Sequence, residues 1–209
     1  MIQNGVTTKT PQNILFGAGV YFHGVTYNEK VAPDEATIKA HVFGATQEGG
    51  TVSIIPTLFH PELDDVLVKV AEFQSKIGEE SKMDVSFVEV KADDIAHMTL
   101  GVVSETTDKS YDVITTSSII RKGHFYEGLG FYGRLLDGRP FIIMYKKALC
   151  TSGFTGDPKS KTNALFKATF ECHSDLEYGT TKLPIAIFIR KAEGWTAVDP
   201  DEVATTTNG

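Results

Sequence analysis

Apolar and polar residues alternate along much of the chain, with the period of two that is typical of β-strands. At the start, Ile14, Phe16, Ala18, Val20 and Phe22 fall on one face of an extended segment, and Leu15 and Tyr21 fall on the other. This strand is therefore predicted to pack on both sides. The same alternation predicts strands at residues 51–59, 66–71, 82–90, 111–120, 131–136, 141–149, 166–172 and 183–189.

Turn signals separate these segments. Residues 48–50, Glu-Gly-Gly, precede the strand that contains Pro56, and a proline predicts a bulge or an edge position because it cannot donate to a ladder. Asp137-Gly138 predicts a two-residue type I′ hairpin turn, in which both central residues have positive φ. Between these two turns, the alternation of apolar and polar residues changes phase at Val88, which predicts a β-bulge.

One segment, residues 92–100, changes to a helical period. Asp93 and Asp94 place negative charge in its first turn, and Gly101 is predicted to end the helix in the left-handed conformation. With about eight strands and one short helix, a parallel sheet would lack helices to cover it. The sequence therefore predicts a mainly β protein in which two antiparallel sheets pack as a sandwich or barrel, with one short flanking α-helix.

The chain is predicted to form a single domain, residues 1–209, because no linker or internal repeat divides it. Its core is expected to span about residues 11–194, with an N-terminal arm at 1–10 and a C-terminal tail at 195–209. Both ends contain few large apolar residues. We expect neighbouring subunits to order one or both of them.

Composition narrows the classes of function. A net charge of −7 argues against a surface that grips nucleic acid, which would concentrate Lys and Arg. The two cysteines, Cys150 and Cys172, have neither a second pair nor CxxC spacing, so buried free thiols are expected. The first twenty residues do not resemble a signal peptide, and no apolar stretch is long enough for a membrane span. We therefore expect a cytosolic product without a membrane partner.

Motifs for catalysis or cofactor binding are not apparent, so no enzyme activity, cofactor or metal is predicted. The six histidines form no HxH or HExxH pattern, and residues 17–19 lack the third glycine of a phosphate loop. The acidic groups at residues 62–65 and at Glu79-Glu80 are expected to be solvated charge. A hydrolase with dispersed catalytic residues stays open as an alternative.

A glycine-aromatic stretch, residues 123–133, is predicted to be a surface loop with aromatics packed beneath it. The same residues support another alternative. The chain could be a monomeric β-sandwich module that binds a carbohydrate or a cell-surface ligand. Its stacking platform would be Phe125, Tyr126, Phe131 and Tyr132.

Four segments in order resemble the major tail tube proteins of phages and prophages of Gram-positive bacteria. They are PQNILFGAGVYF (11–22), GATQEGGTVSIIPTLFHPELDD (44–65), KIGEESKMDVSFVEVKADDI (76–95) and KKALCTSGFTGDPKSKTNALFKATFECHSDL (146–176). Residues 122–132 and 195–209 depart from that pattern. The resemblance implies a structural subunit of a virion tail, which self-assembles into stacked hexameric rings around a channel for genome ejection.

The resemblance also implies a long stacking hairpin, at about residues 59–81, that lies against the next ring. The residues expected at the contact between rings are Glu62, Asp64, Asp65, Val66, Val68, Val70 and Phe73. The three valines and Phe73 would be its buried side. A ring of subunits would also satisfy strand edges that otherwise invite aggregation.

The channel is expected to let double-stranded DNA slide past, because an acidic or neutral lumen does not hold phosphates. Six copies would together carry a charge of −42. Glu72, Asp84 and Glu89 are the candidates to face the lumen. The resemblance further implies the tape measure, tail tip and tail terminator proteins as partners, with assembly in the host bacterial cytoplasm.

Overall fold

The computed structural model describes residue 7 and residues 10–65, 67–89, 91–158 and 160–195, with only the backbone at Pro11, Gln12, Phe16 and Ala18. Most of the expected N-terminal arm, the tail from residue 196 onward, and the expectations for Val66 and Val90 therefore lie outside the described residues. The fold is mainly β, with 45% strand and 12% helix, and its sheets are antiparallel. The predicted fold class is confirmed.

The chain forms ten strands, two α-helices and three short 3₁₀ turns within the described residues. In order these are η1 (Thr10–Asn13), β1 (Leu15–Phe22), α1 (Glu35–Ala40), β2 (Thr46–Phe59), η2 (Ala71–Phe73), β3 (Ser75–Phe87), α2 (Ala92–Met98), β4 (Gly101–Glu105), β5 (Asp112–Thr116), η3 (Lys122–His124), β6 (Tyr126–Leu135), β7 (Pro140–Cys150), β8 (Thr155–Asp157), β9 (Leu165–Cys172) and β10 (Ile185–Ile189).

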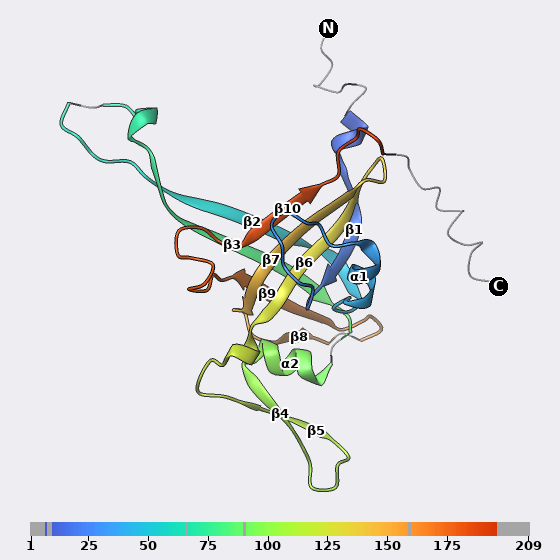
Figure 1. Ribbon diagram of the computed structural model, residues 1–209. Coiled ribbons are helices and arrows are strands. Elements are labelled where there is room, and N and C mark those ends of the chain that lie inside the picture. Colours follow the sequence, from blue (N-terminus) through green and yellow to red (C-terminus); the bar gives the residue numbers. More distant parts are fainter. Residues whose placement is uncertain (1–6, 8–9, 66, 90, 159, 196–209) are drawn as a thin grey trace.

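Eight strands make one large sheet, in the order β1-β6-β7-β9-β3-β2, with β10 beside β7 and β8 beside β9. Strands β4 and β5 form a separate two-stranded sheet that projects from one end of the body (Figure 1). The large sheet curls back on itself. Its two edges approach each other through residues 42–45, where Phe43 N donates to Tyr21 O and Val88 N donates to Ala45 O, both at 2.9 Å.

The curl encloses the main core. Tyr21 from one side of the sheet and Met83 from the other belong to the same buried cluster as Phe170. Aromatic rings fill its centre, with Phe43 and Phe87 edge to face at 4.6 Å between centroids. Burial of these rings supplies most of the driving force, at about 25 cal/mol per Å² of apolar surface. The interior is thus a packed core and not a cavity.

Two helices complete the body. Helix α1 covers the outer face of the sheet, where its Ile38 packs with Phe22 and Met144 in a second cluster. Helix α2 closes one end, because its Met98 joins the main core and the carbonyl oxygen of Asp94 accepts from Tyr126 Oη at 3.3 Å. The helix predicted at residues 92–100 is present. Helix α1 was not predicted.

Several local predictions are wrong. The alternation at residues 66–71 does not form a strand, since its described residues lie in a loop that ends in η2. Strand β3 ends at Phe87, so the phase slip at Val88 marks the end of a strand and not a bulge. Helix α2 is followed by Leu100 in the left-handed conformation, with φ of 53°, in place of Gly101.

The hairpin predicted around residues 137–138 joins β6 to β7, but its turn type differs. Gly138 has φ of 84°, whereas Asp137 does not have positive φ. Gly138 N donates to Leu135 O and Leu135 N donates to Arg139 O, both at 2.8 Å. This pattern fits a three-residue loop with a glycine bulge. Like a type I′ turn, such a loop is compatible with the right-handed twist of the two strands.

The glycine-aromatic stretch is not a surface loop. Most of it is β6, which lies in the middle of the large sheet between β1 and β7. Glycines are needed here because other groups come close to the backbone. A Cβ at Gly130 would lie 2.4 Å from the Phe22 ring, and one at Gly128 would lie 1.7 Å from Val25 O. The glycines thus make room for core side chains and for the chain that crosses β6.

Candidate self-assembly interface

The most prominent surface feature is a two-stranded arm, formed where β2 and β3 continue beyond the body (Figure 1). Strand β3 pairs with β9 only over residues 82–87, whereas it pairs with β2 down to Ser75. Ser81 is still buried in the body, where its hydroxyl bonds with Tyr145 Oη at 2.6 Å, and residues 54–59 and 75–80 continue beyond it as a ribbon. Residues 60–74 connect its strands at the tip, which corresponds to the hairpin predicted at residues 59–81.

Apolar side chains are exposed along this arm. Leu67 is 95% exposed and Val68 is 71% exposed, and the others are at least one-third exposed. The exposed apolar residues of the arm are Ile55, Leu58, Phe59, Leu63, Leu67, Val68, Phe73 and Ile77. A two-stranded ribbon has no second layer to cover such side chains, and it is only marginally stable alone in water. Apolar exposure on this scale marks an interaction surface.

The tip of the arm is acidic as well as apolar. Glu62, Asp64 and Asp65, predicted to lie between rings, are all exposed there, and so is Glu72. Against these four carboxylates, residues 60–74 contain one lysine, Lys69. Of the remaining residues predicted at this contact, Val68 and Phe73 are exposed and Val70 is partly buried.

The arm also presents an open strand edge. Strand β2 is the last strand in the sheet order, so Pro56 lies on an edge strand, as predicted. The pairing of β2 with β3 shifts register between Thr57 and Leu58, directly after this proline. An edge of this kind can pair with another chain, and proteins usually limit that pairing with a proline or a bulge. Both are present here.

The three residues predicted to face a lumen do not lie on one surface. Asp84 is exposed on the outer face of β3, where its Oδ1 accepts from Thr169 Oγ1 at 2.6 Å. Glu89 is exposed just after β3, beside a shallow cavity lined by Val20 and Lys91. Glu72 lies on the arm, in η2. Only Asp84 belongs to a sheet face.

That outer face is polar across β3 and β9. Alternate residues of both strands place their side chains on this face beside Asp84. Lys82 pairs with Glu171 across the two strands, and Ser86 pairs with Lys167. Helix α1 packs on another part of the outer face, over Phe22 and Met144, and α2 contributes Met98 to the core on the inner side of the sheet. The face is thus a candidate lining for a channel.

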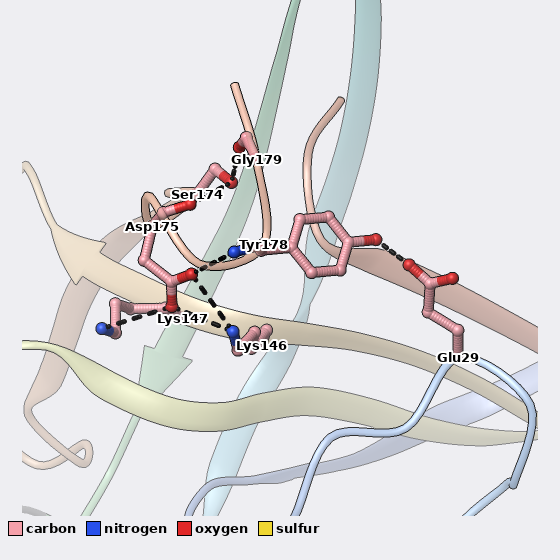
Figure 2. Close-up of polar contacts among 7 residues, drawn as sticks. All are labelled: Glu29, Lys146, Lys147, Ser174, Asp175, Tyr178 and Gly179. Atoms are coloured by element: carbon pink, nitrogen blue, oxygen red, sulfur yellow. Dashed lines mark hydrogen bonds and ion pairs between the residues drawn. The ribbon is translucent and has the colours of Figure 1, made fainter. Parts of the chain in front are cut away.

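A cluster of polar contacts fixes the connection between β9 and β10 (Figure 2). The carboxylate of Asp175 lies 3.0 Å from Lys146 Nζ and 3.7 Å from Lys147 Nζ, and it accepts from Tyr178 N at 2.8 Å. Tyr178 Oη donates to Glu29. Hydrogen bonds from both lysines lower the pKa of Asp175, although burial opposes them. Both lysines are thereby held in ion pairs with Asp175.

Sequence reasoning did not identify this cluster. The only part of the cluster that stands out in the sequence is the doublet Lys146-Lys147. No sequence pattern links these lysines to an aspartate 28 or 29 positions later. The neighbouring cavity, of about 690 Å³, is lined by three lysines but also by Glu127, Asp175 and Glu177. Since these charges offset one another, the cavity is not a preformed anion site.

The carbohydrate-binding alternative loses the residues that supported it. Tyr126 and Phe131 are 2% and 7% exposed and belong to the main core. The hydroxyl of Tyr132 donates to Glu35, and Phe125 packs edge to face with His173. These four side chains do not form a flat exposed platform, which is what stacking on a sugar needs.

The acidic pairs considered for hydrolysis are surface charge. Glu79 lies 2.8 Å from Lys76, and the resulting hydrogen bond lowers the pKa of Glu79. Glu80 forms an ion pair with Lys82. Both cysteines are free and buried, as predicted. Among the residues that the structure describes, no group of three or more His, Cys, Asp or Glu side chains is arranged to hold a metal ion.

Comparisons with known proteins do not identify a family for this chain. No protein-family model matches it. A search of curated proteins likewise finds no significant match. In the described part of the chain, no helix has the length and apolar character needed to cross a membrane.

Proposed function

We propose that this chain is a structural subunit of a phage tail tube, which self-assembles into stacked rings around a channel for DNA. The observation that carries this proposal is the arm, whose exposed apolar side chains have no covering layer in the single chain. The ordered resemblance to the tail tube family supports it. The hairpin that the resemblance implies coincides with the arm.

The energetics favour burial of the arm by another molecule. Moving one Val or Leu side chain out of water contributes about 1.5–3 kcal/mol. Several such side chains on each arm offset the entropy lost on association, which is commonly estimated at about 4–15 kcal/mol. In a ring, every subunit would make this contact through its own arm, so the stabilisation would increase with the number of subunits. Leu67 and Val68 are the most exposed of these side chains, so they have the largest fraction of their surface left to bury.

The channel in this proposal is lined by the outer face of β3 and β9, with Asp84 pointing to the lumen. That face combines carboxylates with lysines, so it does not form a basic track along DNA. A net charge of −7 per subunit has the same effect on a larger scale. DNA would pass through such a channel with few lasting phosphate contacts.

The experiment compares the wild-type chain with Leu67→Asp by gel filtration with light scattering. Leu67 is 95% exposed, so the charge leaves the monomer folded but opposes burial of the arm. Leu176→Asp is the matched control, because Leu176 is 90% exposed in the β9–β10 connection. We expect large assemblies from the wild type and the control, and monomers from Leu67→Asp.

Two results would contradict the proposal. One is a wild-type chain that stays monomeric at all concentrations. The other is an assembly that Leu67→Asp leaves intact, because the arm would then play no part in it. Circular dichroism spectra of the three proteins establish that each is folded.

A further inference from the structure

A second feature lies at the other end of the molecule from the arm. The segment between β5 and β6, residues 117–124, is on the side of the body from which β4 and β5 project (Figure 1). It includes η3. A contact that repeats in one direction needs two different surfaces at opposite ends of the subunit. The arm and this segment meet that requirement.

The segment combines apolar and basic side chains. Ile119 and Ile120 are 60% and 58% exposed, and the next two residues, Arg121 and Lys122, are exposed as well. No acidic residue occurs between Asp112 and Glu127. We refer to residues 119–122 as the basic patch. It is a local exception in a chain whose net charge is −7.

The tip of the arm is its complement. Leu63, Leu67 and Val68 provide exposed apolar surface there, and four carboxylates against one lysine make the tip negative. Apolar side chains can thus meet apolar side chains while opposite charges pair around them. Complementary charge of this kind selects the partner surface and its register.

Other basic doublets fit less well. Lys146 and Lys147 are held by Asp175 (Figure 2). Arg190 and Lys191 follow β10, but the Arg190 guanidinium lies over the Trp195 ring at 5.9 Å and Glu193 is close in sequence. The basic patch joins two exposed isoleucines to two exposed cations and has no acidic residue within 113–126, and only Lys122 of its four residues lines the cavity that also contains Glu127 and Glu177.

We infer that the arm tip of one copy docks on the basic patch, Ile119 to Lys122, of a second copy. This inference rests on the proposed function, because it specifies which surfaces meet in the assembly. The docking is head to tail, so it leaves arms free at one end of any assembly and basic patches free at the other. Addition of further copies can therefore continue along a single axis.

Disulfide trapping tests the inference directly. A chain with Leu67→Cys and Ile120→Cys is oxidised after assembly, and the native Cys150 and Cys172 contribute no background because they are buried. We expect a ladder of cross-linked oligomers from the double variant, and only dimers from a mixture of the two single variants. A chain with Leu67→Cys and Leu176→Cys is the control, and it should give no ladder.

Charge reversal gives a second measurement that does not depend on cross-linking. Arg121→Glu with Lys122→Glu should weaken association at low salt by about tenfold or more, and Asp64→Lys with Asp65→Lys in the same chain should restore it. Assembly without a ladder and without this rescue overturns the inference and leaves the proposed function standing. A wild-type chain that never assembles overturns the proposed function itself.

Discussion

Arg139 is a charged residue placed almost entirely inside the protein, with 5% of its surface exposed. Its Nε donates to Asp137 Oδ2 at 2.6 Å, and its Nη1 donates to Arg190 O at 2.7 Å. Burial alone would raise the pKa of Asp137, but the hydrogen bonds from Arg139 keep that pKa below its ordinary value. The guanidinium therefore fastens the β6–β7 turn to the end of β10.

Arg139→Met should lower the free energy of unfolding by about 1–3 kcal/mol, because it removes the part-buried hydrogen bond to Arg190 O and the charged donor to Asp137. Urea denaturation followed by fluorescence measures this. The matched control is Arg134→Met, since Arg134 is half exposed and forms a surface ion pair with Glu35 at 2.8 Å. Its loss should cost less than about 1 kcal/mol. Equal losses in the two variants would refute the structural role of Arg139.

The two cysteines allow a prediction about pH and reactivity. Burial raises the pKa of the Cys172 thiol to about 12, and it also raises the pKa of Cys150. Both thiols should stay unreactive toward Ellman's reagent at pH 8 until the protein unfolds, because the thiolate is the reactive form. In the unfolded chain Cys172 ionises near pH 9.0, so its contribution to stability is complete below pH 9 and is lost as pH rises toward 12. Fast labelling of the native protein would contradict this.

At the scale of elements, β6 shows why a glycine-rich segment can be a central strand. Gly128 has φ of 57°, and a Cβ there would collide with the backbone of Val25. The crossing chain is held by a hydrogen bond from Gly24 N to Glu127 O at 2.6 Å. The close approach is therefore built into the fold, and a side chain at this position cannot be accommodated without moving backbone.

Gly128→Ala should destabilise the protein by about 3 kcal/mol or more, or prevent folding, through positive φ and the clash with Val25 O. Gly123→Ala tests the specificity of this effect within the same stretch. Nothing lies within 4 Å of a Cβ at Gly123, and its φ is not positive, so the change should stay within about 0.5 kcal/mol. Thermal melts of both variants provide the comparison. Similar melting temperatures would show that the Gly128 contact is not needed.

The alternation of apolar and polar residues predicted strands correctly where one face of the strand is buried in the core. In β9, Ala168, Phe170 and Cys172 lie in the core as their spacing of two requires. It failed at residues 66–71, because valines in an exposed loop can alternate without pairing to anything. Helix α1 has six residues, too few for a period to be visible. Its sequence signal was the N-cap, Asp34, whose Oδ1 accepts from Thr37 N at 2.7 Å.

At the scale of the whole molecule, the alternation predicted a mainly β chain, and the resemblance implied a long hairpin at about residues 59–81, which include the tip of the β2–β3 hairpin. The sequence could not predict which side chains of that hairpin stay uncovered, because exposure depends on where β9 stops pairing with β3. Nor could it bring Asp175 to Lys146 and Lys147, since that contact depends on the register of β7 and β9. Long-range pairing is a property of the assembled sheet and not of any local pattern.

The arm gives the molecule its direction. It projects from one end, and the basic patch lies at the other, so one kind of contact can be repeated from copy to copy (Figure 1). A subunit built in this way should be soluble at low concentration and associate as concentration rises. In the proposed assembly, the net charge of −7 would oppose non-specific aggregation, and the complementary surfaces would direct the contact.

Electron microscopy of the purified full-length chain in negative stain, over a series of rising concentrations, tests self-assembly into a hollow structure most directly. The account predicts rings or tubes with a central channel, formed without any other protein. Fields that contain only separate subunits, even at the highest concentration that stays in solution, would contradict it.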